Sequence, residues 1–408
     1  MQQIGILGGG QLGMLLARSI RALGAEAIIY EPDGRAPACQ EARHTFNGSF
    51  KDEASLARFF DKCDSVTYEF ENVASELLFE FEKEKPLYPS ASVLKTTQDR
   101  YLEKSFLKEA GLPHAAFELV TAPEKLLASV EEFGYPCVLK TTRGGYDGKG
   151  QWFLRNADDV REHLEAVANR KDATQKEYRV VLEEALDIAM EASCIAARSA
   201  DGSEIAFPIF ENMHKDHILD FTIVPARLPD TVAEKIKEVG MKAAKELSVI
   251  GLLTTEFFLT RTRPRKSNSI EVDNWHLLIN EFAPRPHNSG HVTTKACTLS
   301  QYDALAKILM KQPLEEPVAS SAGYYCMGNI LGDVYLSQNE KHADAGDDRL
   351  HTLDTSCREA HPAVVDVILY GKKEARTGRK MGHFITHADT AEQALEAAKA
   401  FRKALSNS

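Results

Sequence analysis

Residues 277–291 read Leu-Leu-Ile-Asn-Glu-Phe-Ala-Pro-Arg-Pro-His-Asn-Ser-Gly-His, and this stretch carries more chemistry than any other part of the chain. The apolar run 275–279 predicts a buried strand that ends at the amide of Asn280 and the carboxylate of Glu281. A polar turn follows. Buried polar groups need partners, which a metal ion on phosphates and a second anionic ligand would supply. The alternative is a polar loop without function.

Composition and charge exclude several classes of protein. The 408 residues are 43% apolar and 27% charged, which is typical of a globular protein of two or three domains. Apolar runs are too short to span a bilayer and no signal peptide precedes the first strand, so we expect a cytoplasmic protein without a membrane partner. The net charge of −11 argues against nucleic acid as a partner. Seven scattered cysteines indicate reduced thiols, not a zinc site.

Strands alternate with helices over the first hundred residues, which predicts a parallel sheet with ligands at the carboxyl ends of its strands. A helix over 92–110 and a compact α+β unit over about 123–205 come next. The ranges of the other expected elements are strands 4–7, 27–30, 65–68, 136–140, 178–183 and 364–370, and helices 11–23, 157–169, 231–247 and 391–405.

A glycine motif, Gly8-Gly9-Gly10-Gln11-Leu12-Gly13, lies between the first strand and the first helix. With Glu31 at the end of the second strand, it satisfies the pattern of a dinucleotide-binding enzyme. However, a helix N-terminus favours any phosphate ester, by ~0.3–1 kcal/mol. Nothing downstream resembles hydride-transfer machinery, so a dinucleotide-dependent oxidoreductase is the less favoured alternative.

A second glycine-rich loop follows Lys140, at the end of an expected strand. Its sequence is not that of a P-loop. We expect a flap whose backbone N–H groups close over phosphates, with Lys140 as a point charge against them. A flexible hairpin is the alternative.

Further acidic residues stand at strand positions suited to a nucleotide. The run 183–186 closes a strand whose free backbone groups could read an adenine edge, and Glu191 follows at a distance suited to a ribose hydroxyl. Glu256 and Glu281 are expected on neighbouring antiparallel strands. Two such carboxylates can share Mg²⁺ whose remaining ligands are phosphate oxygens and water.

In order and spacing, these motifs resemble the ATP-grasp superfamily. Within it, the chain resembles the 5-(carboxyamino)imidazole ribonucleotide synthase family of purine biosynthesis from end to end. The motifs that carry this second resemblance are 8–13, Tyr68-Glu69-Phe70-Glu71-Asn72, Gln98-Asp99-Arg100, 285–291, Tyr370-Gly371-Lys372 and 376–383.

The resemblance implies an α/β and α+β architecture with an ATP-grasp fold. It implies a Rossmann-like pre-ATP-grasp domain (1–103), an ATP-grasp domain (104–310) with its lid subdomain at about 123–205, and a β-rich C-terminal subdomain with a mixed sheet (311–408) that completes the substrate site. The implied reaction uses ATP and bicarbonate to carboxylate 5-aminoimidazole ribonucleotide through carboxyphosphate, releasing ADP and phosphate. The implied cofactor is Mg²⁺ or Mn²⁺, and the implied assembly is a homodimer.

The resemblance also implies roles for individual residues. The ATP-binding set is Arg100, Lys140, Gly145, Tyr146, Asp147, Gly148, Lys149, Gly150, Gln151, Glu183, Glu184, Ala185, Leu186, Glu191, His214, Asn280 and Glu281. The metal ligands are Glu256 and Glu281. The substrate-binding set is Gln11, Asn288, Ser289, His291, Lys372 and Arg379. The catalytic set is Asp147, Lys149, Arg285, His287 and Lys372. His287 or His291 could relay a proton in its neutral form, or serve only structure.

Two features leave questions open. The segment 263–274 between Glu256 and Glu281 is longer than such a family member needs, and we expect a flexible excursion away from the metal. Lys373 competes with Lys372 for the substrate phosphate. A related ligase, such as a formate-dependent glycinamide ribonucleotide transformylase, is the other alternative, but the motifs at 285–291 and 372–383 argue against it.

Overall fold

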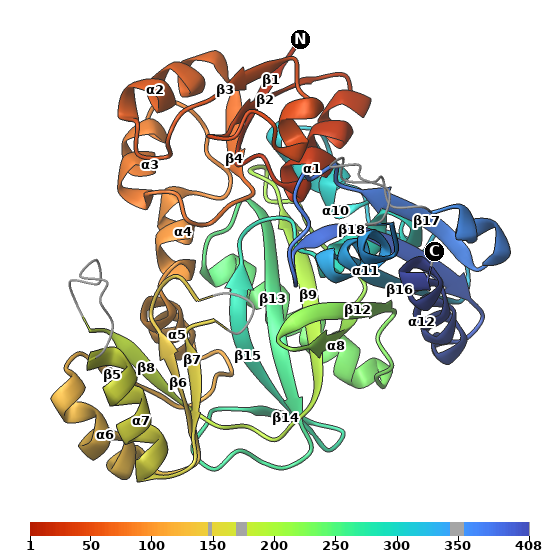
Figure 1. Ribbon diagram of the computed structural model, residues 1–408. Coiled ribbons are helices and arrows are strands. Elements are labelled where there is room, and N and C mark those ends of the chain that lie inside the picture. Colours follow the sequence, from red (N-terminus) through yellow and green to blue (C-terminus); the bar gives the residue numbers. More distant parts are fainter. Residues whose placement is uncertain (146–148, 169–177, 343–354, 408) are drawn as a thin grey trace.

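The computed structural model describes residues 1–145, 149–168, 178–342 and 355–407, and its strands form three sheets (Figure 1). The N-terminal sheet is parallel, with strand order β3-β2-β1-β4. The expected parallel sheet is therefore confirmed. The sequence missed β3, since its short run His-Thr-Phe is largely exposed and lacks a periodic apolar pattern. Its elements are β1 Gln3–Leu7, α1 Gln11–Ala22, β2 Glu26–Tyr30, β3 His44–Phe46, α2 Glu53–Lys62, β4 Ser65–Tyr68 and α3 Ser75–Phe81.

The helix expected over 92–110 is wrong in one respect, because the structure has two helices there. These are α4 (Ala91–Thr97) and α5 (Arg100–Glu109). Asp99 has an extended backbone, and its carboxylate accepts hydrogen bonds from the N–H groups of Tyr101 and Leu102. An N-cap of this kind begins a new helix. After this break, α5 runs toward the large sheet.

The small sheet has the order β5-β8-β6-β7 and is covered by α6 (Leu126–Phe133) and α7 (Ala157–Ala168). In Figure 1 it stands to one side of the other two sheets. The expected unit reached residue 205, but β9 (Ile188–Arg198) pairs with strands of the large sheet, so the small sheet ends at Glu184. Its strands are β5 Phe117–Val120, β6 Cys137–Thr141, β7 Gln151–Leu154 and β8 Val180–Glu184.

The large sheet has ten strands in the order β14-β15-β13-β9-β11-β12-β16-β18-β17, with β10 beside β9. The C-terminal strands were expected to form their own mixed sheet. Instead β16 pairs with β12, so they extend the central sheet. Its strands are β9, β10 Glu204–Ala206, β11 Phe210–Lys215, β12 Ile218–Val224, β13 Gly251–Thr260, β14 Ile270–Val272, β15 Trp275–Ala283, β16 Tyr324–Leu331, β17 Val364–Leu369 and β18 Lys380–Ala388.

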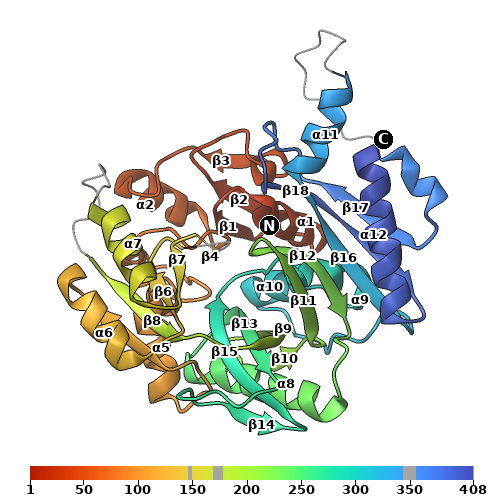
Figure 2. The same ribbon diagram turned by 60° about the horizontal axis from the view of Figure 1, so that its bottom comes forward.

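Helices cover the large sheet and join it to the N-terminal sheet. The core places α1 and β1 against α10, with Leu15, Tyr302 and Leu305 among the buried side chains. Figure 2 shows α12 along the C-terminal strands, where Phe401 packs edge-on against Phe384. The remaining helices are α8 Asp230–Glu246, α9 Thr293–Ala296, α10 Gln301–Leu309, α11 Gly332–His342 and α12 Ala391–Asn407.

The segment 263–274, which was expected to be a flexible excursion away from the metal, is hydrogen-bonded to the small sheet. Its N–H groups at Arg265 and Lys266 donate to the two carboxylate oxygens of Glu184 at 2.7 and 3.0 Å. The hydroxyl of Ser267 donates to the same carboxylate at 2.6 Å and accepts from the N–H of Ala116. Several polar residues of the segment thus have partners at the small sheet. The segment therefore ties the edge of that sheet to the large sheet.

Two expectations from composition can be compared with the structure. Each of the seven cysteines lies within the described residues and is not paired in a disulfide there. Across the described part of the chain, no helix is both long and apolar enough to cross a membrane.

Candidate active site

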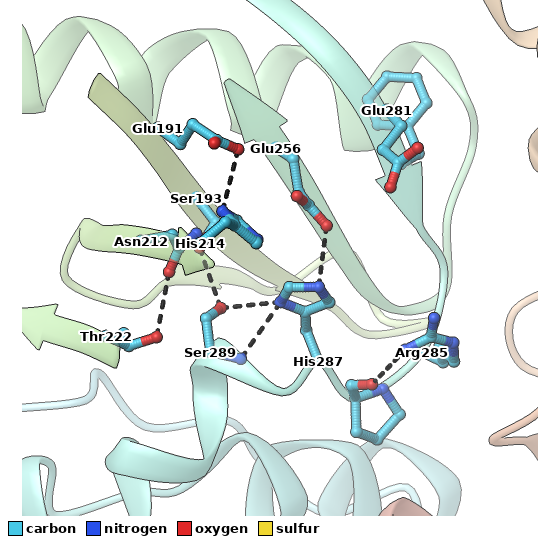
Figure 3. Close-up of polar contacts among 12 residues, drawn as sticks. Glu191, Ser193, Asn212, His214, Thr222, Glu256, Glu281, Arg285, His287 and Ser289 are labelled. Carbon is cyan, nitrogen blue, oxygen red and sulfur yellow. Dashed lines mark hydrogen bonds and ion pairs between the residues drawn. The ribbon is translucent and has the colours of Figure 1, made fainter. Parts of the chain in front are cut away.

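Two carboxylates lie opposite each other in the middle of the large sheet. Glu256 on β13 pairs directly with Glu281 on β15, as the sequence predicted (Figure 3). Burial and the charge of Glu256 raise the pKa of Glu281, although Arg100 lies 3.4 Å away. Burial opposes ionisation of Glu256 too, but His287, His214 and Arg285 lower its pKa to about 2. Two acids held this close favour a cation between them.

A buried cluster of charges lies beside this pair. Lys140 on β6 contacts Glu183 on β8 at 2.9 Å, and Lys104 on α5 contacts the same carboxylate at 3.5 Å. Lys104 also donates to the backbone oxygen of Asn280 at 2.8 Å. Each of these charges is paired, as burial requires. The cluster therefore connects the small sheet to the strand that carries Glu281.

The residues expected around the base and ribose of ATP extend along the same edge. Glu191 on β9 and His214 on β11 are 3.1 Å apart, and although burial opposes it, Glu191 raises the pKa of His214. Ala185 and Leu186 lie in the connection between β8 and β9. The carboxylate of Glu184 is already bonded to the segment 263–274, which leaves backbone groups for a nucleotide.

The glycine-rich loop begins where β6 ends. Tyr146, Asp147 and Gly148, which the sequence assigned to it, lie outside the described residues. The N–H of Thr141 donates to the carbonyl of Gly150, and the N–H of Arg100 donates to Thr142. Gly145 packs against the backbone of Lys149, where a Cβ would lie 2.8 Å from its carbonyl oxygen. Gln151, at the start of β7, reaches His217 at 3.3 Å. The described ends of the loop thus lie beside Arg100.

The turn after β15 brings several of the predicted side chains to the carboxylate pair. Arg285 forms an ion pair with Glu71 at 2.8 Å, and His287 contacts Glu256 at 2.9 Å. Ser289 begins a short 3-10 helix (Ser289–Val292) and bonds to His287. Both polar side-chain atoms of Asn288, and the side-chain oxygen of Asn280, are buried without a hydrogen-bond partner. Such atoms are available to a ligand.

His291 occupies a different place from its neighbours. Its side chain is fully buried. Its Nδ1 atom forms a hydrogen bond of 2.6 Å with the hydroxyl of Tyr302, and its ring stacks on that of His383 with 4.4 Å between the ring centroids. Burial and the nearby His383 lower its pKa well below the ordinary value. His291 therefore supports the turn from beneath and does not face solvent beside Asn288.

A cavity of about 580 Å³ lies between the N-terminal sheet and the C-terminal strands. Lys372, Arg379 and Gly10 line it, and Gln11 follows Gly10 as the first residue of α1. Burial and Arg379 lower the pKa of Lys372 to about 8. The two cations, Lys372 and Arg379, suit a phosphate ester. Lys373 also lines the cavity, but it is exposed.

The glycine motif is filled by the chain's own acids. The N–H of Gly9 donates to Glu31 at 2.8 Å, and the N–H of Gly10 donates to Glu69 at 2.7 Å. A Cβ at Gly8 or Gly10 would lie within 3 Å of the carboxylate of Glu69, so glycine is required there. Glu31, the ribose ligand of the dinucleotide alternative, has its carboxylate committed to this loop. This arrangement argues against that alternative.

Three residues near this site had no role predicted from the sequence. Glu69 and Glu71 follow β4 and connect the cavity to Arg285, while Lys104 lies one turn into the helix that Asp99 begins. An acid-rich run directly after a parallel strand was the available signal for the first two. Nothing in the pattern marked Lys104, because a lysine on a helix is ordinarily exposed.

Two facing carboxylates on the large sheet, with a small sheet beside them as a lid, define an ATP-grasp protein. An ATP-grasp domain model matches residues 105–302. A ribonucleotide synthetase preATP-grasp domain matches 1–98, and a phosphoribosylaminoimidazole carboxylase C-terminal domain matches 326–397. The predicted fold class is confirmed.

The relatives narrow this class. The chain is 33% identical to the N5-carboxyaminoimidazole ribonucleotide synthase of Bacillus subtilis, over 93% of this chain and 90% of that protein. It is 34% identical to the bifunctional purine synthesis protein purC/E of Dictyostelium discoideum, of which it spans 36%. The chain belongs to the N5-carboxyaminoimidazole ribonucleotide synthase family.

Solved structures agree with this assignment. An ADP complex of an N5-carboxyaminoimidazole ribonucleotide synthetase superposes with a TM-score of 0.85 and 34% identity, covering 100% of this chain and 98% of that one. The Aspergillus clavatus synthase in complex with ADP and 5-aminoimidazole ribonucleotide gives a TM-score of 0.82 at 27% identity, with 100% and 99% covered.

Proposed function

We propose that the carboxylate pair and the cavity beside α1 are the two halves of one active site, for ATP and for the ribonucleotide. As a member of its family, the protein is an ATP-dependent ligase that forms a carbon–nitrogen bond in purine biosynthesis. It carboxylates 5-aminoimidazole ribonucleotide to the N5-carboxyamino product. The observation that carries the proposed site is the direct pairing of Glu256 with Glu281.

The donor set fits magnesium. Mg²⁺ prefers oxygen ligands and is held by one or two carboxylates together with phosphates and water. Glu256 and Glu281 supply two carboxylates, and burial together with the charge of Glu256 raises the pKa of Glu281 despite the nearby Arg100. Bound there, Mg²⁺ or Mn²⁺ would neutralise charge on the phosphates of ATP.

The chain's own residues position the remaining groups. Lys140 and Arg100 direct positive charge at the phosphates, and the glycine-rich loop excludes water from the reacting groups. Bicarbonate takes the γ-phosphoryl group of ATP, which forms carboxyphosphate and ADP. Asn288, with its unpartnered amide, and Arg285 are the candidates to hold bicarbonate in line.

The second half of the reaction joins the two sites. The exocyclic amine of the ribonucleotide attacks the carboxyl carbon, the carbon–oxygen bond to phosphate breaks, and the amine loses a proton. Lys372 and Arg379 bind the ribonucleotide phosphate, with Gly10 and Gln11 at the N-terminus of α1 beside it. Arg379 can bind bidentately. His291 supports this site from below because it is fully buried.

The three-part organisation and the assembly are also proposals. The family models at 1–98, 105–302 and 326–397 support domains at 1–103, 104–310 and 311–408. The homodimer and the cytoplasmic location both stay predictions. Analytical ultracentrifugation tests the homodimer.

The test of the proposed function is ADP release. We expect release to require 5-aminoimidazole ribonucleotide, bicarbonate and Mg²⁺ together, with stoichiometric formation of the carboxylated product. Release that is unchanged when the ribonucleotide is replaced by glycinamide ribonucleotide with formate would contradict it. Binding of 5-aminoimidazole ribonucleotide that is unaffected by Lys372→Ala would place the phosphate elsewhere.

A further inference from the structure

An unbroken line of hydrogen bonds runs from the interior of the large sheet to Glu256 (Figure 3). It passes through strands β12, β11 and β9 and the turn after β15, and it ends at Glu256 on β13. Its successive contacts are Thr222 to Asn212 at 3.2 Å, Asn212 to Ser193 at 3.0 Å, Ser193 to Ser289 at 3.0 Å, Ser289 to His287 at 2.8 Å and His287 to Glu256 at 2.9 Å. The first four of these residues are buried, and His287 is largely so.

The end of this line at His287 has a definite direction. The backbone N–H of Ser289 donates to Nδ1 of His287 at 3.3 Å, and a backbone N–H can only donate. Nδ1 is therefore an acceptor. On the other side of the ring, Nε2 faces the carboxylate of Glu256, which in its ionised form can only accept. Both neighbours thus require the ring proton on Nε2.

The remaining groups continue the same direction without conflict. The hydroxyl of Ser289 donates to Nδ1 and accepts from the hydroxyl of Ser193. The side-chain N–H of Asn212 donates to Ser193, and the hydroxyl of Thr222 donates to the oxygen of Asn212. The hydroxyls of Ser193 and Ser289 then each donate once and accept once, and the hydroxyl of Thr222 donates at the start of the line.

We propose that Ser193, Asn212 and Ser289 are positioning residues that hold His287 with its single ring proton on Nε2, directed at Glu256. In this form His287 orients Glu256 without neutralising it. The carboxylate of Glu256 is thereby held in place opposite Glu281. Both ring nitrogens are engaged, so His287 acts on Glu256 and does not relay a proton to the ribonucleotide. The expected effect on cation affinity rests on the proposed function, whereas the direction of the hydrogen bonds does not.

Nitrogen NMR tests the direction in the protein without metal. In protein with ¹⁵N-labelled histidine, the signals of His287 are assigned as those that vanish in His287→Gln. We expect the spectrum of a ring protonated at Nε2 alone, with Nδ1 shifted by an accepted hydrogen bond. A ring protonated at Nδ1, or at both nitrogens, overturns the proposal.

Asn212→Asp reverses the line while conserving shape. An aspartate cannot donate, so the hydroxyl of Ser193 turns toward it and that of Ser289 turns toward Ser193. We expect the Nδ1 signal of His287 to move. Mn²⁺ affinity in the presence of ADP should fall by about 10–100-fold, the usual scale for losing an outer partner of a metal ligand. Unchanged His287 signals in folded Asn212→Asp overturn the proposal.

A matched control and a second variant separate the possible failures. Asn329 is another fully buried asparagine, whose amide donates to Leu219, and Asn329→Asp should leave the His287 signals and Mn²⁺ affinity unchanged. If Glu256→Gln binds Mn²⁺ as tightly as the wild type, the metal assignment fails while the hydrogen-bond direction stands. If Asn212→Asp does not fold, the wild-type spectrum alone decides.

Discussion

The ammonium group of Lys104 lies 3.5 Å from the carboxylate of Glu183, and both side chains are almost wholly enclosed. Lys104 comes from α5, while Glu183 lies on β8, an inner strand of the small sheet. Because Lys104 also donates to the backbone of Asn280, a single cation connects three elements of the nucleotide site. Removing either partner would leave a buried charge or buried carbonyl groups without compensation.

Lys104→Met should therefore destabilise the fold. We expect the free energy of unfolding to fall by about 3 kcal/mol, at the low end for a broken buried ion pair because Lys140 still pairs with Glu183. Urea unfolding at neutral pH measures this loss. The control is Lys108→Met on the exposed face of the same helix, which should change stability by less than about 0.5 kcal/mol. Equal effects of the two variants would refute the structural role.

The same pair predicts a dependence of stability on pH. Burial alone would raise the pKa of Glu183, but Lys104 and Lys140 outweigh it and lower that pKa from 4.5 to about 2. The contribution of ionised Glu183 is thus fully present above pH 4.5 and is lost as the pH falls toward 2. The stability difference between wild type and Lys104→Met should narrow over this window. A constant difference from pH 5 to pH 2.5 would count against the assignment.

Glu281→Gln should abolish most activity while leaving the fold intact. The substitution conserves shape but removes one of two facing charges, and loss of one preorganised electrostatic group typically lowers the rate by ~10²–10³. ADP release and thermal unfolding, measured side by side, check both statements. Glu271→Gln on the exposed β14 serves as the control. Turnover like that of the wild type in Glu281→Gln would remove Glu281 from the metal site.

Lys372→Ala should mainly raise the KM for the ribonucleotide. Lys372 lines the cavity from a partly buried position, whereas Lys373 beside it is exposed. Losing a charge-assisted hydrogen bond costs about 1.5–3 kcal/mol, or roughly 10–150-fold in KM. Steady-state kinetics with each substrate varied in turn measures it, and Lys373→Ala is the matched control. An effect confined to the KM for ATP, or a larger one for Lys373→Ala, would reverse the assignment.

Ser267→Ala should loosen the small sheet. Its hydroxyl bonds both Glu184 and the N–H of Ala116, so its removal leaves buried groups unsatisfied at about 1–3 kcal/mol. We expect faster hydrogen exchange in β8 and a lower unfolding midpoint. Ser269→Ala, two residues further along the same segment, is the control, because its hydroxyl makes only a long 3.4 Å contact with His276. Unaltered exchange in β8 would show that the segment does not hold the sheet.

The sequence was most informative where periodicity and chemistry coincide. The apolar run 275–279 predicted β15, and acids at matched positions of two neighbouring strands then predicted the pairing of Glu256 with Glu281. The resemblance to a known family pointed to Lys372 and Arg379, which line one cavity with Gly10. The pairing of the two acids needed only local pattern.

What the sequence could not supply is set by contacts between distant residues. The break at Asp99 depends on a cap inside an otherwise helical pattern, and the place of 263–274 depends on Glu184, some eighty residues earlier. The resemblance implied that His291 binds substrate, but the sequence could not show that its ring stacks on His383. A polar residue's direction is decided by packing, which a linear pattern does not contain.

The continuity of the large sheet has a practical consequence for dissecting this molecule. Since β16 adds directly to β12, cutting the chain before Tyr324 would strip a row of backbone donors and acceptors from the edge of β12. A long bare edge recruits strands from other molecules. Truncated chains that end before Tyr324 should therefore aggregate on expression. Isolating this part of the protein will need an added segment that pairs with the exposed edge of β12.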